Sequence, residues 1–430
     1  VDIAGVASSI LATPTIFPLH LRAAASGCAF RWMPAPQQQC GDKWRAFRSA
    51  FACCGDADMG KFMIAHLNHG GALLNPQTAA LMHGYSPNAY SRLPGMALGF
   101  YHEDRNGLQI VGHGGDTVFF HSDLHLFLDK NVGLYVSMNS PGKATAVHPL
   151  REQLFEQFTD RYFPANTPYL PTAATARQHG AVMAGHYVSS RASGFSFLRL
   201  AALAGQTKVT VDQDGILSAS TITDASGDPR HWREVGPWLW QEVGGNDYLQ
   251  AIPAAGGKIR MFSITPYGAI IEFLPAPAAL DAGWILPLAG LAFLVLLVAA
   301  LGWPLNALIR RRYKQPALRD GQALRLHRVS RITAWLFLAV AAGWLVMLSL
   351  VDKDLDVLNG GLDLPMRLLQ IVLLLAIIGS LATAWNAWKV ASAKGSRWWS
   401  IVWAVIIALS ALFLAWLCVD VGLLTLSLDF

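Results

Sequence analysis

The chain has 430 residues, of which 53% are hydrophobic and only 14% are charged. Soluble domains carry charge on about 25% of their residues, so this composition excludes one large soluble domain, and 15 Trp, 10 Tyr and 20 Phe exclude intrinsic disorder. The net charge of +5 does not indicate a nucleic-acid partner. Residues 1–280 hold 20 basic and 20 acidic side chains, so the whole excess lies in residues 281–430.

Residues 1–55 show no sustained helical or strand periodicity, and we interpret them as an irregular or divergent N-terminal segment. The segment holds Cys28, Cys40, Cys53 and Cys54 without a C-x-x-C spacing, so no metal site is predicted there. The chain begins at Val1 without a basic export signal, which predicts that its true beginning is missing.

Residues 56–165 are predicted to form one α+β domain that begins with two helices. Asp58 is expected to cap the first helix, which Gly70-Gly71 would end. Asn75-Pro76 has the sequence of a second helix start, because Asn is a favoured cap and Pro suits the first helical position. The second helix is expected to point three side chains inward, namely Ala79, Leu81 and Met82.

Four strands and a closing helix complete the predicted domain. Turn residues separate the strand candidates at 105–107, 114–116 and 129–131. This order of elements is typical of an antiparallel sheet covered by helices. The strands are Met96–His102, Leu108–Gly112, Val118–Phe127 and Val132–Met138, and the helix is Val147–Tyr162 with Leu150, Leu154, Phe155 and Phe158 as its apolar face.

The chain then changes character twice. Residues 166–182 form a linker rich in Pro, Ala and Thr, and residues 183–275 hold short β-rich runs between Gly, Asp and Pro turns. This second pattern predicts a small all-β domain, either a barrel or a sandwich.

Residues 282–430 are predicted to form four transmembrane helices. Each apolar run reaches the ~20 residues needed to cross the hydrocarbon core of a bilayer. None contains an ionisable residue of the kind that marks a transport pathway, so the lipid bilayer is the expected partner and an anchor the expected role. The runs are Ala282–Ile309, Ile332–Val351, Leu368–Trp388 and Trp398–Val419.

The charges of the connecting loops predict the orientation of these helices. Residues 310–331 hold eight Lys and Arg and residues 389–397 hold three, whereas residues 352–363 hold four Asp and one Lys. Basic loops stay on the cytoplasmic side. We therefore expect a multi-pass protein of a bacterial inner (cytoplasmic) membrane with residues 1–280 on the periplasmic or extracellular side.

The stretch from Asp58 to Ser140 resembles the serine β-lactamase and penicillin-binding-protein superfamily, in its class C β-lactamase-like branch. The resemblance is carried by Asp58-Met59-Gly60-Lys61, by Leu98-Gly99-Phe100 and above all by Gly112-His113-Gly114-Gly115, which precedes the strand Gly133-Leu134-Tyr135-Val136-Ser137-Met138. Residues 56–165 would then be part of such a serine hydrolase domain. Members with a small β domain and a C-terminal membrane region are similar to residues 183–430 as well.

The resemblance implies hydrolysis of an amide, ester or β-lactam bond through an acyl-enzyme, with no cofactor. Its substrates would be peptidoglycan-like peptides, esters or β-lactams. His113 would stand where many members carry Lys, Gly114 and Gly115 would let the substrate approach the strand, and the backbone N–H of Asp116 would be one oxyanion donor.

The sequence departs from the family at the nucleophile. No Ser-x-x-Lys and no Tyr-x-Asn precede the His-Gly-Gly, and the single Ser-x-x-Lys of the chain, Ser140–Lys143, contains Pro-Gly and reads as a turn. We therefore predict a truncated, inactive hydrolase or, as the alternative, a non-catalytic cell-surface binding or sensing module. His121, Asp123 and His125 share one strand face, and we interpret them as polar surface residues in preference to a metal site.

Overall fold

The computed structural model describes residues 56–430 with gaps at 118–119, 166–169, 193, 195, 225, 269, 315–320, 354–356, 358–359 and 426–430. The expectations for residues 1–55 lie outside the described residues. The chain divides into two compact units. The first comprises Val1–Gly185 and Thr207–Pro275, and the second comprises His186–Gln206 and Ala276–Phe430.

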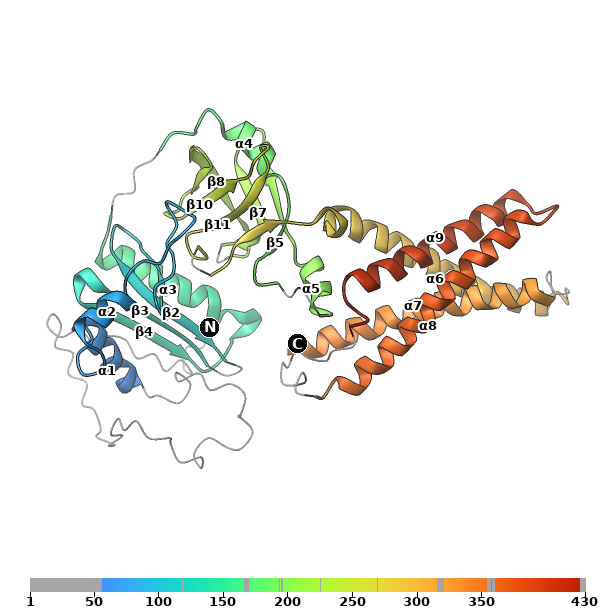
Figure 1. Ribbon diagram of the computed structural model, residues 1–430, viewed down its shortest axis with the longest axis horizontal. Helices are drawn as coiled ribbons and strands as arrows, with labels where there is room; N and C mark the ends of the chain where they lie inside the picture. The colour runs from blue at the N-terminus through green and yellow to red at the C-terminus, as the bar shows by residue number, and fades with distance from the viewer. Residues whose placement is uncertain are drawn as a thin grey trace, which may run out of the picture. The chain divides into compact units, whose positions relative to one another are not determined.

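The first unit contains an antiparallel four-stranded sheet of order β1-β2-β3-β4 (Figure 1). The turn between its first two strands lies at Asn106 and Gly107, whose φ angles of 56° and 74° are the left-handed conformation that a tight hairpin requires. The 3₁₀ helix η1 (Leu128–Lys130) connects the last two strands. The strands are β1 (Tyr101–His102), β2 (Ile110–Asp116), β3 (His121–Phe127) and β4 (Val132–Met138).

Helices cover both faces of this sheet. On one face, Met59 and Met63 of α1 (Asp56–Leu67) lie in one apolar cluster with Leu124 and Leu126 of β3. On the other face, Phe155 and Phe158 of α3 (Val147–Tyr162) pack against a second cluster made of Ile110, Phe127 and Leu134. The short helix α2 (Pro76–Met82) has the predicted Asn75 cap, whose side chain accepts a hydrogen bond from the backbone of Thr78.

Several local expectations were wrong. Asp58 does not cap α1 but lies inside it, where its carboxylate pairs with Lys61 at 2.9 Å. Leu81 and Leu150, both predicted to point inward, are 67% and 51% exposed. The predicted Phe155 and Phe158 do pack on the sheet, but the buried residues of α3 are Val147, Arg151 and Thr159, because the helix also covers a polar strip of the sheet.

The strand limits also differ from the sequence prediction. The first predicted strand is reduced to the two residues of β1, since residues 97–100 turn back toward Met96. The expected turn at 114–116 is strand: β2 continues to Asp116, which pairs with His121. The helix Val147–Tyr162 has the predicted bounds.

The β-rich region forms a closed barrel, one of the two architectures expected from the sequence. The strand order around it is β10-β11-β12-β5-β6-β7-β8-β9, and the fully buried Trp232 and Trp240 contribute to its core. Its strands are β5 (Gly185–Ser189), β6 (Thr207–Val211), β7 (Leu217–Thr223), β8 (Pro229–Gly236), β9 (Leu239–Glu242), β10 (Tyr248–Pro253), β11 (Ile259–Ile264) and β12 (Phe273–Pro275), and α4 (Ala176–Met183) precedes them. The short helix α5 (Leu198–Ala204) belongs to the second unit.

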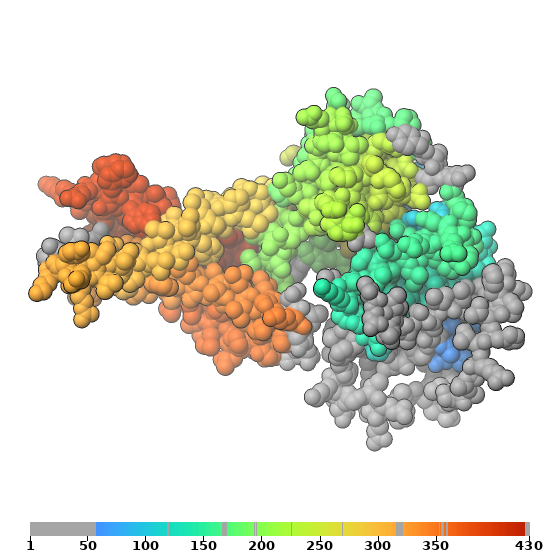
Figure 2. Space-filling model, turned by 180° about the vertical axis from the view of Figure 1, so that it is seen from behind, coloured from blue at the N-terminus to red at the C-terminus, as the bar shows by residue number. Residues whose placement is uncertain are grey.

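Within the first unit, an ion-pair network joins the barrel to α3, and Figure 2 shows the atoms of α3 beside those of the barrel. Asp247 lies at its centre and is 3% exposed. Its carboxylate contacts Arg105 at 3.5 Å and Arg230 at 2.9 Å. Arg230 also contacts Glu152 of α3 at 2.8 Å, and Arg105 contacts Asp160 of α3 at 2.9 Å.

Among its described residues, the second unit contains four helices that are each long and apolar enough to cross a membrane. The prediction of four such helices is confirmed, although each extends beyond the apolar run seen in the sequence. Gly379 lets α8 approach α7 closely, because a Cβ there would lie 2.2 Å from Thr333 Oγ1. After the 3₁₀ helix η3 (Ala278–Leu280), the helices are α6 (Ala282–Arg312), α7 (Gly321–Lys353), α8 (Asp363–Ser392) and α9 (Trp398–Asp420).

Candidate functional site

The residues predicted to bind substrate lie on the outer half of β2. β1 pairs with Val111 and Gly112 and goes no further. Gly114, Gly115 and Asp116 pair with β3 on one side, while no strand among the described residues pairs with them on the other. The segment from Gly114 to Asp116 is therefore a sheet edge.

Hydrogen bonds define which backbone groups face this edge. The carbonyl of Ile110 accepts from the N–H of Glu103 at 2.9 Å, and the N–H of Gly114 donates to the phenol oxygen of Tyr101. Both contacts lie on the side of β2 away from β3. Since backbone direction alternates along an antiparallel strand, the N–H of Asp116 also faces the open edge, as an oxyanion donor would have to.

His113 and Gly115, which alternate with Gly112, Gly114 and Asp116 along β2, lie on the sheet face opposite to α3. His113 is exposed, and its ring lies 5.4 Å from the ring of Tyr101. A Cβ added at Gly115 would meet no atom within 4 Å, so the strand is open to approach here. The structure thus places His113, Gly114, Gly115 and Asp116 together on one strand, and their roles remain a prediction.

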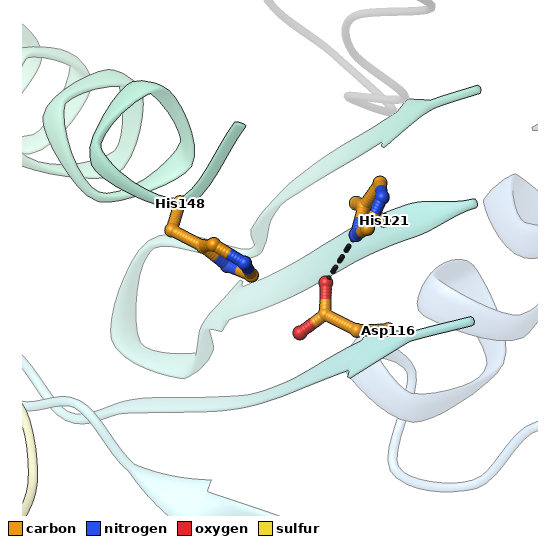
Figure 3. A group of neighbouring side chains, drawn as sticks. All are labelled: Asp116, His121 and His148. Atoms are coloured by element: carbon orange, nitrogen blue, oxygen red, sulfur yellow. Dashed lines mark hydrogen bonds and ion pairs between the residues drawn. The ribbon is translucent and has the colours of Figure 1, made fainter. Parts of the chain in front are cut away.

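Asp116 belongs to a cluster formed by β2, β3 and α3 (Figure 3). Its carboxylate accepts a hydrogen bond from His121 Nδ1 at 2.7 Å. The guanidinium of Arg151, which is 8% exposed, lies 3.1 Å from the same carboxylate oxygen and donates to the carbonyl of Ser122 at 2.7 Å. His148 Nδ1 accepts a hydrogen bond from Arg151 Nη2 at 3.2 Å.

These contacts define the charge state of Asp116. Burial would raise the pKa of its carboxyl, but the hydrogen bond from His121 and the charge of Arg151 outweigh burial and lower that pKa below its usual value. Asp116 is therefore ionised at neutral pH. Since an ionised carboxylate can only accept, the proton of His121 lies on Nδ1.

A second cluster lies farther along the same sheet face. His125 Nδ1 donates to Glu103 Oε2 at 2.6 Å, and His125 Nε2 lies 3.6 Å from Asp123 Oδ2. The imidazole stacks on Phe155 of α3, with ring centroids 4.2 Å apart. His125 is 2% exposed, so these contacts occur in the interior.

The two carboxylates keep His125 protonated. Burial would lower the pKa of the imidazole, but the charges of Glu103 and Asp123 outweigh burial and raise the pKa to about 9. Burial also raises the pKa of Glu103, against the opposing effect of His125. The group is thus a buried imidazolium between two acidic side chains.

Glycines make room for this second cluster. A Cβ at Gly112 would lie 2.0 Å from Glu103 Oε2 and 2.6 Å from the carbonyl of Leu124. A Cβ at Gly114 would lie 3.0 Å from the phenol oxygen of Tyr101 and 3.1 Å from Asp123 Oδ1. Gly112 and Gly114 are therefore required by packing, independently of any substrate, because side chains there would collide with the polar side chains that lie against β2.

Two groups of side chains are close enough together to share a metal ion, Asp116 with His121 and His148, and Glu103 with Asp123 and His125. In each, a protein cation already neutralises the carboxylates: Arg151 in the first and protonated His125 in the second. We therefore describe both as charge networks. His121, Asp123 and His125 share the face facing α3, but His121 and His125 are buried and belong to different networks, so interpreting them as surface residues was wrong.

Sequence reasoning missed Glu103, His148 and Arg151. His148 and Arg151 are three residues apart in α3 and so share a helix face, a signal that was available. It was overlooked because the inward face was assigned by hydrophobicity to Leu150 and Leu154. No local pattern marks Glu103, which follows β1 and reaches His125 only because β1 pairs with β2.

The single Ser-x-x-Lys of the chain does not have the geometry of a nucleophile and base. Ser140 Oγ accepts a hydrogen bond from the N–H of Gly142 at 3.1 Å, and Gly142 has a φ of 69°. Lys143 then begins the 3₁₀ helix η2 (Lys143–Thr145). The motif is a turn, as expected from its Pro-Gly, and the two side chains are not one helical turn apart on an α-helix.

No protein-family model and no curated protein matches this chain. Among solved structures, a crystal structure of SurE with D-Leu is similar over 51% of this chain and 49% of that chain, with 18% identity and a TM-score of 0.31. A crystal structure of SurE is similar over 50% of this chain and 48% of that chain, with 16% identity and a TM-score of 0.30. The structure of the octameric penicillin-binding protein homologue from Pyrococcus abyssi is similar over 51% of this chain and 46% of that chain, with 13% identity and a TM-score of 0.21.

The chain therefore spans about half the length of these neighbours. Their likeness is too weak to assign the chain to a family, and it does not support the narrower class C resemblance.

Proposed function

We propose that this protein is a membrane-anchored, extracytoplasmic domain of the β-lactamase-like serine hydrolase type, and that its β2 edge binds an acyl compound with an amide, ester or β-lactam carbonyl. The observation that carries the proposal is the sheet edge from Gly114 to Asp116. An extended substrate can add to such an edge through backbone hydrogen bonds. The N–H of Asp116 would then meet the carbonyl oxygen.

The proposal separates binding from turnover. The Ser140–Lys143 turn does not supply the activated nucleophile that acyl transfer needs. We therefore expect residues 56–430 to bind such a compound reversibly and not to form an acyl-enzyme. The same observation favours the second candidate function, a cell-surface binding or sensing module that uses the edge without catalysis.

A fluorescent penicillin tests the proposal on the full chain in detergent. We expect its fluorescence polarisation to rise with protein concentration and no label to survive denaturation on a gel. Gly115→Val should abolish the rise, because its side chain enters open space beside the edge. Gly236→Val in the barrel is the matched control, since a Cβ at Gly236 also meets no atom within 4 Å.

Each outcome has a separate meaning. A label that survives denaturation would show that the chain has a nucleophile and forms an acyl-enzyme. That result would contradict a binding module without catalysis. Reversible binding that Gly115→Val abolishes supports the edge as the binding surface. Equal binding by the two variants would overturn the assignment of the edge, and an absence of binding by the unaltered chain would overturn the proposal for β-lactams.

A further inference from the structure

The membrane unit contains a polar cavity that the hydrolase proposal does not use. It lies between α7, α8 and α9 and has a volume of about 80 Å³. This volume admits two or three water molecules, at ~30 Å³ each, or one small ionic group. Its polar lining comprises His327, Ser330, Arg331, Thr383, Asn386 and Ser400.

Half of the polar lining is buried in the helix packing, while His327 and Arg331 are half-buried and Ser400 is exposed. Ser330, Thr383 and Asn386 are 3%, 1% and 7% exposed. The guanidinium of Arg331 is held at the wall by donating from Nη1 to the carbonyl of Ala299 in α6 at 2.7 Å. Polar and charged groups within a bilayer are costly, and where they occur they mark a functional site.

The cavity lies at the basic end of the helix bundle. Its residues come from the first part of α7, the last part of α8 and the first part of α9, next to the connections α6–α7 and α8–α9. The sequence from 310 to 331 holds eight Lys and Arg and one acidic residue, and the sequence from 389 to 397 holds three basic residues and no acidic one. The local potential at this end is therefore positive.

The chemistry of the lining fits an anion rich in oxygen atoms. Guanidinium, amide and imidazole groups donate hydrogen bonds, whereas the hydroxyls of Ser330 and Thr383 already donate to the carbonyls of Leu326 and Gly379. The described lining includes no carboxylate. Basic pockets between transmembrane helices at the cytoplasmic side are the places where anionic lipid headgroups bind. A phosphate group meets both the charge and the size of this cavity.

We propose that the His327–Arg331 cavity binds the phosphate group of an anionic phospholipid from the leaflet at this end of the bundle. The guanidinium of Arg331 supplies the charge, and the amide of Asn386 supplies a further donor. Free phosphate has the same chemistry, so the test separates the two sources. The proposal does not depend on the function of the β2 edge.

The test uses the full chain in nanodiscs of phosphatidylcholine with and without phosphatidylglycerol, and native mass spectrometry counts the lipids retained per chain. We expect one phosphatidylglycerol to be retained. Arg331→Gln should weaken retention about tenfold, the loss expected for one charge-assisted hydrogen-bonding partner, and Arg331→Lys should restore part of it. Arg328→Gln is the matched control, because it removes the same charge from an exposed position of α7 outside the cavity.

Asn386→Leu leaves the charge of the cavity unchanged and should also weaken retention of phosphatidylglycerol. This variant replaces Arg331→Gln in the test if Arg331→Gln fails to fold. Equal losses in Arg331→Gln and Arg328→Gln would overturn the site, because diffuse attraction would then explain binding. Equal retention of phosphatidylcholine would overturn it as well. Thermal stabilisation by inorganic phosphate at matched ionic strength, without any by phosphatidylglycerol, would overturn the lipid as the source.

Discussion

Glu103 Oε2 accepts a hydrogen bond from His125 Nδ1 at 2.6 Å, directly over a glycine of β2. The pair joins a segment that follows β1 to the centre of β3, and its imidazole lies against α3. Its formation requires that Gly112 carry no side chain and that His125 hold a proton in the interior. Both requirements can be tested directly.

Gly112→Ala should destabilise the sheet. The added methyl group would lie 2.0 Å from Glu103 Oε2 and 2.6 Å from a β3 carbonyl, so the carboxylate or the strand must move. We expect a loss of about 1–3 kcal/mol, typical of overpacking, measured by hydrogen exchange of the β2–β3 amides. Gly115→Ala is the control, because its methyl group meets no atom within 4 Å and should change exchange little. Equal protection in both variants would contradict the packing around Gly112.

The His125 network should make the sheet less stable as pH rises. His125 has a pKa of about 9 in the folded protein, against 6.5 for a free imidazole, so folding binds a proton more tightly. The stabilisation is complete below pH 6.5 and is lost as pH rises through 9. Its size is about 3 kcal/mol, since each pH unit between 6.5 and about 9 is worth ~1.4 kcal/mol.

His125→Gln provides the measurement for this pH dependence. The variant lacks the titrating group, so the difference in β2–β3 hydrogen exchange between the two proteins should be largest below pH 6.5 and should shrink toward pH 9. Comparison at each pH cancels the intrinsic exchange rate. A difference that stays constant from pH 6 to about 10 would contradict the raised pKa.

Asp247→Asn should loosen the attachment of the barrel to α3. Asp247 is 3% exposed and contacts both Arg105 and Arg230. The substitution removes a buried charged acceptor from the network, while Arg105 keeps Asp160 and Arg230 keeps Glu152, so we expect a cost of about 1–3 kcal/mol. Limited proteolysis between α3 and α4 should therefore become faster. Asp214→Asn, in an exposed turn of the barrel, is the control, and equal rates for the two variants would speak against the network.

The bundle should place its basic connections in the cytoplasm. Alkaline phosphatase, which is active only after export, should be active when fused after Gly361 and inactive when fused after Lys394. The physical reason is the retention of Lys and Arg on the cytoplasmic side. A fusion of green fluorescent protein, which fluoresces in the cytoplasm, should give the reverse pattern. Activity of the phosphatase after Lys394 would invert the orientation and place residues 56–275 inside the cell.

The sequence by itself determined the four apolar helices, the final helix of the sheet domain and the β-rich character of residues 183–275. Membrane spans and helix limits depend on properties of neighbouring residues, namely continuous apolarity, caps and turn residues. The bounds Val147–Tyr162 were predicted correctly, although Ala146 provides no side-chain cap for this helix.

Only the tertiary structure decided what the polar residues do. Glu103 and His125 are 22 positions apart, and Arg151 reaches Asp116 from an element 35 positions away. Such contacts depend on strand register and on which face of a helix packs on the sheet, and neither is encoded locally. Hydrophobicity therefore assigned Leu150 to the interior, whereas the packing placed Arg151 there, because the facing strip of β2 and β3 is polar.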